Sequence, residues 1–292
     1  MNVTLERNQA RPPVRTTEVR MAKTYGMDSD ARSALAVLER LAASGRVAVA
    51  GGFMPDAGVR AHLARLGITE HVTEADFFKF RHMVIPYCGV SPRERKAWED
   101  AEHPLCDLTA PLVRRAQVAL GLLRMEGAQA LVIGHHDDPE SQALAKVTPG
   151  TKIIEDTTDT ARLHFAPSFG VVCQTTLSPR RASWLLQQLR MRYRDATVTF
   201  LNTASPAMCA REAALENLLG WCDAVVIVGQ PGEASCAALA EAALRHGKPS
   251  VTATAPANLD LTVLAGARRL ALTAGAFALD ERIHAIEALL TR

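Results

Sequence analysis

The sequence predicts an α/β protein with mostly parallel sheets. Short runs of aliphatic residues, such as residues 130–133 (ALVI) and 224–228 (AVVIV), alternate with longer segments whose apolar residues have helical spacing. Several helical segments stop at a glycine, as residues 57–66 do before Gly67. Because alternating strands and helices return the chain to the same edge of a sheet, this order is typical of parallel sheets.

The first part of the chain contains two predicted helices between short strands. Ala31, Ala34, Leu35 and Leu38 lie on one side of a helix, so residues 29–42 are expected to be amphipathic. Before residue 111 we expect strands at residues 19–22, 47–50 and 83–86, and helices at residues 29–42 and 57–66.

The rest of the chain repeats this alternation of strands and helices. We expect strands at residues 130–134, 152–155, 171–175, 198–201, 224–229, 250–253 and 270–274. We expect helices at residues 112–125, 181–192, 211–221, 234–246 and 281–290, the last with Asp280 as its N-cap.

Length and composition argue against several classes of protein. The 292 residues suffice for two or three lobes, and a net charge of +2 gives no reason to expect a nucleic-acid or membrane partner. The six cysteines form no CxxC pair, which argues against a zinc knuckle or a thioredoxin motif. Residues 1–18 are polar, so we expect a flexible tail and no signal peptide. No apolar run is long enough for a membrane span, and we expect a cytoplasmic protein.

The segment with the most chemistry is residues 130–140, ALVIGHHDDPE. A buried strand ends at Gly134 and is followed by two histidines, two aspartates, Pro139 and Glu140. Ionisable side chains at the carboxyl end of a strand are typical of α/β sites. The alternative is a polar loop that opens a solvated helix, with Pro139 in the first turn.

Four segments together resemble the 4-hydroxy-3-methylbut-2-enyl diphosphate reductase family, also called LytB or IspH. Residues 107–113 (DLTAPLV) resemble the family's DATCPLV, and residues 133–140 (IGHHDDPE) resemble IGHxGHPE. Residues 173–178 (CQTTLS) resemble TQTTLS, and residues 272–276 (LTAGA) resemble VTAGA. The motifs occur in the family's order, and the resemblance covers residues 19 to 292.

The resemblance implies three α/β lobes in a pseudo-threefold arrangement around a central pocket. On this basis we expect the first lobe at residues 29–110 and the second at residues 111–196. The third lobe would combine residues 19–28 with residues 197–292.

The resemblance also implies an iron–sulfur cluster on three cysteines, one from each lobe, but this chain lacks them. The three positions align with Asp28, Ala110 and Ala204. Thiolates are the usual ligands of such clusters, whereas alanine offers no donor atom. Cys106 and Cys209 lie four and five residues away from two of these positions. Four residues of strand span about 13 Å, so we predict that the cluster is absent.

The positions with which the family binds substrate are altered as well. Cys88 and Asp138 stand where the family has histidines, and Glu233 lies in a segment where it has a serine–asparagine cluster. Asp138 and Glu233 would repel the diphosphate. Glu140 is retained at the family's proton-relay position. Thr175 and Thr176 match its substrate-contacting threonine pair.

We therefore predict a LytB/IspH-like enzyme without a cluster that carries out non-redox chemistry on a small molecule in the central pocket. Carboxyl and imidazole groups that lie close together suit acid–base catalysis and also a divalent metal with oxygen and nitrogen ligands. The expected catalytic residues are Glu140, Cys88, Asp138 and His136. The expected substrate-binding residues are His135, Thr175, Thr176 and Asp28.

Each assignment has an alternative. Cys88 could be a small buried apolar residue, and Glu140 could serve only to stabilise a helix start. The whole chain could be a catalytically inactive ligand-binding or regulatory module. It could also be the isoprenoid reductase with an unusual cluster. The sequence gives no oligomeric state.

Overall fold

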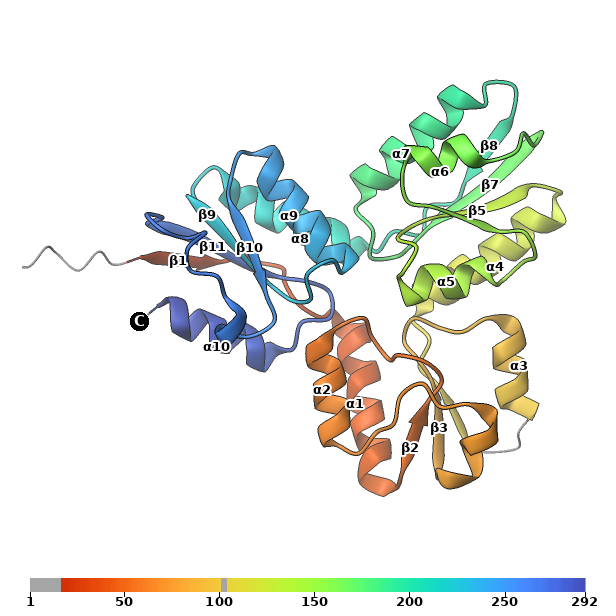
Figure 1. Cartoon of the computed structure of the whole chain (residues 1–292), viewed down its shortest axis with the longest axis horizontal. Helices are drawn as coiled ribbons and strands as arrows, with labels where there is room; N and C mark the ends of the chain where they lie inside the picture. The colour runs from red at the N-terminus through yellow and green to blue at the C-terminus, as the bar shows by residue number, and fades with distance from the viewer. Residues whose placement is uncertain (1–16, 101–103, 292) are drawn as a thin grey trace, which may run out of the picture.

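The computed structural model describes residues 17–100 and 104–291. These residues form three lobes, each built on its own sheet (Figure 1). The strand orders are β2-β3-β4, β6-β5-β7-β8 and β1-β11-β9-β10, and every pairing within these sheets is parallel. The predicted fold class is therefore confirmed.

The first lobe packs its helices against a three-stranded sheet. Its strands are β2 (Val47–Val49), β3 (His82–Ile85) and β4 (Leu105–Asp107). Its helices are α1 (Ser29–Ser44), α2 (Ala57–Arg65) and α3 (Pro92–Asp100), with a 3₁₀ helix at Glu74–Lys79. Neither β4 nor α3 was expected, because the strand is short and Trp98 is the one buried residue of that polar helix.

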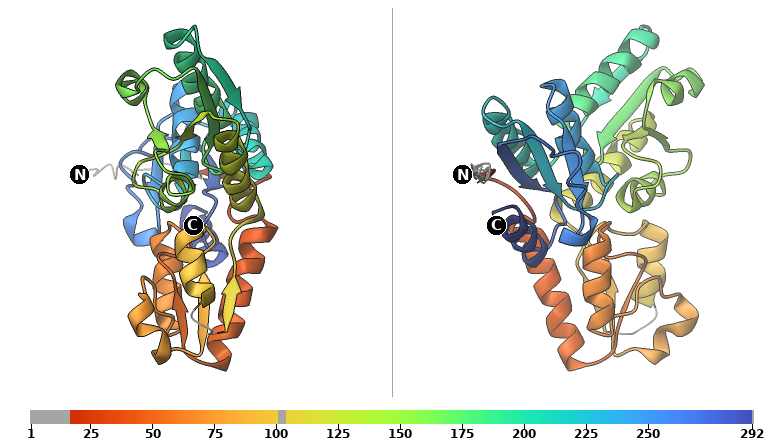
Figure 2. Two further views of the ribbon diagram at one scale, coloured as in Figure 1. Left: turned by 90° about the vertical axis from the view of Figure 1, so that its right-hand side faces the viewer. Right: turned by 60° about the vertical axis from the view of Figure 1, so that its left-hand side comes forward.

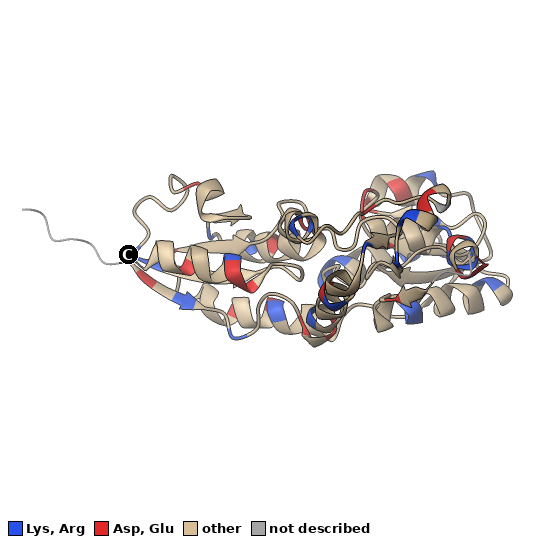
Figure 3. Ribbon diagram, turned by 90° about the horizontal axis from the view of Figure 1, so that it is seen from below, with Lys and Arg blue, Asp and Glu red and all other residues tan. Residues whose placement is uncertain are grey.

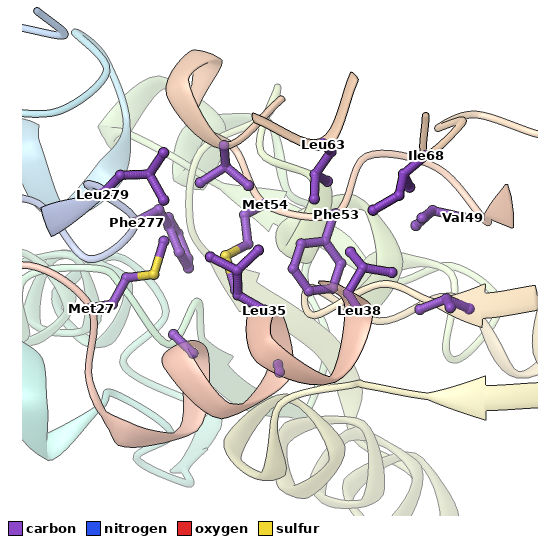
Figure 4. Close-up of a cluster of buried hydrophobic side chains, with 14 of the residues drawn as sticks. Met27, Leu35, Leu38, Val49, Phe53, Met54, Leu63, Ile68, Phe277 and Leu279 are labelled. Atoms are coloured by element: carbon purple, nitrogen blue, oxygen red, sulfur yellow. The ribbon is translucent and has the colours of Figure 1, made fainter. Parts of the chain in front are cut away.

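The core of the first lobe includes side chains from the end of the chain (Figure 4). Phe53, Leu38 and Leu63 are fully buried at its centre. Phe277 and Leu279 of the third lobe pack against the same cluster. Because burying a large apolar side chain stabilises a fold by about 1.5–3 kcal/mol, this shared core fixes the first lobe against the third.

The second lobe contains one strand more than expected. Its strands are β5 (Gln129–Ile133), β6 (Lys152–Ile154), β7 (Ser168–Cys173) and β8 (Thr197–Phe200). Its helices are α4 (Pro111–Met125), α5 (Pro139–Ala145), α6 (Thr157–Arg162) and α7 (Pro179–Arg192). The predicted boundary after residue 196 is wrong, because β8 pairs with β7 over four residues and forms the edge of this sheet.

The third lobe combines the first described strand with the last part of the chain. Its strands are β1 (Glu18–Met21), β9 (Ala224–Val228), β10 (Ser250–Ala253) and β11 (Arg269–Ala274). Its helices are α8 (Pro206–Leu219), α9 (Ala234–Arg245) and α10 (Asp280–Leu290), with a 3₁₀ helix at Pro256–Asn258. The expected tail of residues 1–18 lies mostly outside the described residues, and Glu18 already belongs to β1. Asp280 is not the N-cap of α10, because Leu279 holds that position.

The three lobes meet near the middle of the molecule, and one end of the first lobe faces the other two lobes (Figure 2). Asp280 pairs with Arg32 of α1, which links the third lobe to the first. Lys146 of the second lobe lies 3.4 Å from Glu94 of the first. Basic and acidic residues are interspersed over the ribbon (Figure 3). In the described part of the chain, no helix is both long and apolar enough to cross a membrane.

Candidate active site

A small cavity lies where the three lobes meet. Its volume is about 40 Å³, which is room for a few water molecules. The first lobe contributes Tyr87, the second contributes Thr175 and Thr176, and Arg211 comes from α8 of the third. Asp28, in the connection between β1 and α1, also lines it. This cavity lies where the central pocket is predicted, but its volume is smaller than that of a typical ligand site.

Glu140 is held beside this cavity by the start of α5. Strand β5 ends at Ile133, and a side chain at Gly134 would collide with Ser141, so this tight approach requires glycine. Asp138 is the N-cap and accepts hydrogen bonds from the backbone N–H groups of Glu140 (2.8 Å) and Ser141 (3.2 Å). Pro139 occupies the first helical position, where its missing N–H costs nothing.

The Glu140 carboxyl group is 5% exposed and bound to a single residue. Its Oε1 accepts the backbone N–H of Thr175 at 2.6 Å, and its Oε2 accepts the Thr175 hydroxyl at 2.8 Å. Burial raises the pKa of Glu140 to about 8, and the negative charge of Asp138 acts in the same direction. Glu140 does not itself line the cavity. Thr175, whose hydroxyl donates to Glu140, does line it.

The titrations of Asp138 and Glu140 influence each other because the two carboxyl groups lie close together. Burial raises the pKa of Asp138 to about 6, and Glu233 of the third lobe adds to this effect. Two carboxyl groups close together resist simultaneous ionisation. Burial and the neighbouring negative charge therefore favour protonation of Glu140 more strongly than protonation of Asp138.

A first prediction follows from the raised pKa of Glu140. The folded state holds this proton more tightly than the unfolded chain, whose glutamate titrates near 4.5. The resulting stabilisation is complete below pH 4.5 and is lost as the pH rises toward about 8. Glu140→Gln removes this titration. The unfolding free energy of the variant should therefore fall less steeply with pH over this range than that of the wild type, by up to about 1.4 kcal/mol per pH unit. Urea unfolding at a series of pH values measures the slopes.

A surface substitution provides the control for this measurement. Glu126 is an exposed glutamate at the end of α4, and Glu126→Gln should keep the wild-type slope. Equal slopes for wild type and Glu140→Gln would show that Glu140 is ionised in the folded protein at neutral pH.

The two predicted histidines do not lie at the cavity. His135 is half-buried and its Nδ1 lies 3.0 Å from Oε1 of Glu155. The His136 side chain is 51% exposed, and its Nε2 lies 2.9 Å from Oδ2 of Asp159. It lines a separate pocket of about 650 Å³ beside β6. The expected catalytic position of His136 is thus wrong, because the chain turns outward between Gly134 and the cap of α5.

Cys88 lies close to the carboxyl pair but is not activated. The thiol is buried and donates to the carbonyl oxygen of Gly52, with Sγ 3.4 Å away. Burial raises its pKa, and the negative charges of Asp138 and Glu140 raise it further. A nucleophilic cysteine needs a lowered pKa, so this environment disfavours a nucleophilic role for Cys88.

The predicted substrate-binding residues fall into two groups. Asp28, Thr175 and Thr176 all line the cavity, and Asp28 also caps α1 through a hydrogen bond from Ala31 (2.9 Å). His135 instead lines a cleft of about 320 Å³, mostly between the second and third lobes, together with Asp138, Glu233 and Pro55 of the first lobe.

Four polar residues at the cavity were not predicted: Asp30, Tyr87, Ser205 and Arg211. Tyr87 follows a predicted strand, and its position after the carboxyl end of β3 was the available signal. Ser205 is the N-cap of α8. A serine before a proline-initiated helix commonly serves only to cap it, so the sequence does not mark Ser205 as a site residue. Arg211 lies on the buried side of α8. A single arginine in a helical pattern gives no sign of such burial.

The cleft between the second and third lobes contains two helix starts whose N–H donors are already occupied. Asp138 accepts from the first turn of α5, and Glu233 accepts from Ser235 (3.0 Å) and Cys236 (3.2 Å) of α9. Ser235 also donates its hydroxyl to Glu233. Among the described residues, no three or more His, Cys, Asp or Glu side chains are grouped so as to hold a metal ion.

Known proteins match this chain over most of its described length. Residues 19–291 match the model of the LytB protein family. The 4-hydroxy-3-methylbut-2-enyl diphosphate reductase 2 of Burkholderia mallei is 30% identical over 187 residues, which are 63% of this chain and 57% of that protein. The corresponding reductase of Methylibium petroleiphilum is 30% identical over 214 residues, which are 70% of this chain and 65% of that protein. The matched region thus spans less than two thirds of these relatives.

Solved structures agree with this match at the level of the fold. The E-1-hydroxy-2-methyl-but-2-enyl-4-diphosphate reductase from Plasmodium falciparum superposes with a TM-score of 0.84 at 20% identity, over 95% of this chain and 89% of that one. A second structure, of (E)-4-hydroxy-3-methyl-but-2-enyl diphosphate reductase, gives a TM-score of 0.64 at 18% identity, over 93% of this chain and 98% of that one. With its three parallel sheets around one cavity and its match over residues 19–291, the chain belongs to the LytB family.

Proposed function

We propose that this LytB-family chain carries no iron–sulfur cluster and catalyses non-redox proton-transfer chemistry on a small molecule at the central cavity. The observation that carries the proposal is the Glu140–Thr175 pair. A buried carboxyl group with a pKa of about 8 donates or accepts a proton near neutral pH. The Thr175 hydroxyl connects this group to the cavity.

The residues around the cavity do not fit an iron–sulfur cluster. The side chains lining it offer carboxylate, phenol, hydroxyl and guanidinium groups, and Ala110 offers no donor. In the third lobe, Ser205 and Arg211 line the cavity, whereas Ala204, which we aligned with the third cysteine, packs toward the core of the second lobe. Iron–sulfur clusters need thiolate ligands, and no residue lining the cavity is a cysteine.

The six cysteines lie elsewhere. Cys209 is exposed on α8, and Cys106 packs against the core of the first lobe. The remaining four are buried: Cys88, Cys173, Cys222 and Cys236. Since no cysteine lines the cavity, ligation there would require the lobes to be rebuilt, and we derive no step through a cluster.

The chemistry that these residues support is a proton relay. Protonated Glu140 donates to the Thr175 hydroxyl while Thr175 donates its own proton to a ligand atom in the cavity. The carboxylate left behind is stabilised by the same two hydrogen bonds from Thr175 that the structure contains. The reverse direction makes Glu140 a general base. Both residues are largely buried, which strengthens the two hydrogen bonds.

The relatives' diphosphate substrate is not proposed for this chain. In the cleft beside the cavity, the N–H donors at the starts of α5 and α9 are bound to Asp138 and Glu233. A diphosphate would have to displace these carboxyl groups and lie next to them. Each displaced carboxyl group would then lose its charge-assisted hydrogen bonds.

The experiment that tests the proposed function is metabolite profiling without a reductant. The full-length protein is incubated in air with a small-molecule extract, and masses that fall and rise are followed by mass spectrometry. We expect one compound to be converted to an isomer or to a product of water addition or loss. Glu140→Gln should slow this conversion roughly 10²–10⁴-fold, and Glu126→Gln should not change it.

The result also separates the alternative functions. A compound that co-purifies and is never converted would identify a ligand-binding or regulatory module. Conversion that requires an electron donor, together with iron in the protein, would identify a reductase. Either result would refute the proposed function.

A further inference from the structure

A second and much larger pocket lies beside β6, on the edge of the second lobe, and we call it the β6 pocket. Its volume is about 650 Å³, which is within the range of pockets that bind small organic molecules. It shares no lining residue with the central cavity. Because β6 is the outermost strand of its sheet, one row of its backbone N–H and C=O groups faces away from β5. The pocket is therefore a separate space with a polar strand edge along it.

Much of the lining of the β6 pocket is apolar. Leu163, Phe165 and Ala166 contribute from the connection between α6 and β7, and Ile153 and Ile154 contribute from β6. Phe165 is 63% exposed, although phenylalanine is among the residue types that are most often buried. An aromatic or aliphatic group in the pocket would remove this ring from water, and burial of apolar area favours binding. The lining thus fits a ligand with an apolar ring or chain.

Basic side chains line the same pocket. Lys152 comes from β6, Arg162 comes from the last turn of α6, and His164 follows two residues later. Among the residues that the structure describes, no carboxylate lies within ion-pair distance of any of these three. All three are exposed, so water stabilises their charge in the free protein. Lys152 and Arg162 are therefore available to pair with an anion.

One carboxylate, Asp159, also lines the β6 pocket, but its own donors compensate its charge. Its Oδ2 accepts the backbone N–H groups of Glu155 (2.9 Å) and Asp156 (3.4 Å). The same oxygen lies 2.9 Å from Nε2 of His136. Two permanent cations and one compensated carboxylate leave the lining of the pocket positive overall. An anion is therefore favoured over a cation of the same shape.

We propose that the β6 pocket binds a small organic anion with an apolar body, of which an aromatic carboxylate is the simplest case. Lys152 and Arg162 attract the acid group, while Phe165 and Leu163 pack against the apolar body. The site is additional to the proposed proton-transfer site, because the two pockets have no residue in common. Neither charge alone nor an apolar ring alone uses both parts of the lining.

Binding of 2-naphthoate to the full-length protein tests this proposal. Isothermal titration calorimetry measures the dissociation constant and the stoichiometry. Two comparison compounds separate the contributions, since 2-naphthamide keeps the ring and removes the charge, whereas inorganic phosphate has charge and no ring. We expect one 2-naphthoate to bind per chain, roughly tenfold more tightly than either comparison compound. Added salt should weaken this binding, because the two cations are exposed.

Variants at exposed positions assign the binding to the β6 pocket. Phe165→Ala should weaken 2-naphthoate binding roughly tenfold through loss of the ring contact. The double variant Lys152→Gln/Arg162→Gln should also weaken it roughly tenfold, and should leave the weaker binding of 2-naphthamide unchanged, because only charge is removed. Since these side chains are exposed, the variants should fold like the wild type.

Two matched substitutions outside the pocket provide controls. Phe78 is a 74% exposed phenylalanine of the first lobe, and Arg180 is an exposed arginine of α7. Phe78→Ala and Arg180→Gln should both bind 2-naphthoate as the wild type does.

Several results would overturn the proposal. These are the absence of saturable 2-naphthoate binding, equally tight binding of 2-naphthamide, and unchanged 2-naphthoate binding in Phe165→Ala or in the double variant. An equal loss of binding in the two control variants would contradict it as well. None of these results bears on the protonation of Glu140, so failure of this proposal is distinguishable from failure of the proposed function.

Discussion

Anaerobic incubation of the full-length protein with iron and sulfide is expected to leave it colourless. Iron–sulfur clusters absorb visible light strongly, so the expected difference from a cluster protein is all-or-none. The reason lies in the donor set. The three positions where the resemblance leads us to expect cysteines are Asp28, Ala110 and Ala204. One carboxylate and two methyl groups do not replace thiolates.

The control for reconstitution is a clustered relative treated in parallel, such as the reductase of Methylibium petroleiphilum. Iron and sulfide near stoichiometry in the desalted protein, with a visible spectrum, would contradict the expectation. Cys106 and Cys209 would then be the first candidates for relocated ligands, and Cys106→Ser and Cys209→Ser would test them.

A strain that lacks 4-hydroxy-3-methylbut-2-enyl diphosphate reductase is expected not to grow when this chain is supplied in its place. Reduction of an allylic diphosphate needs an electron carrier, and the residues around the cavity do not fit the family's cluster. Substrate binding is opposed as well, because Asp138 and Glu233 occupy the N–H donors that face the cleft. We therefore expect complete loss of rescue.

The same vector carrying a relative's reductase gene provides the positive control. Immunoblotting shows whether the chain is made and soluble. Growth without the downstream isoprenoid products, at a level well above the empty vector, would refute the prediction and support the reductase alternative.

Strand and helix order was predictable because it depends on local spacing. The helix at residues 29–42 and the strand at residues 224–229 were placed within two residues at each end, since apolar spacing specifies which side is buried. Short polar elements were not found. Two thirds of the residues of helix α3 are charged, and its burial depends on Trp98 alone.

The site was predictable where a backbone turn fixes the side chain. Gly134, Pro139 and the cap Asp138 together determine where Glu140 points, and these residues are visible in the sequence. The prediction for His136 was wrong because, in a tight turn, a shift of one residue moves a side chain from the cavity to the solvent. Arg211 was missed for a tertiary reason, since its burial arises only when the loop containing Gly26 packs over α8.

The most direct test of an acid–base site centred on Glu140 is the ionisation state of that side chain. Infrared difference spectra of protein labelled with ¹³C-glutamate, compared between wild type and Glu140→Gln, isolate its carboxyl band. We predict a protonated C=O band at neutral pH that disappears with a midpoint of about 8. A carboxylate band that persists down to the ordinary glutamate range near 4.5 would contradict the proposed chemistry.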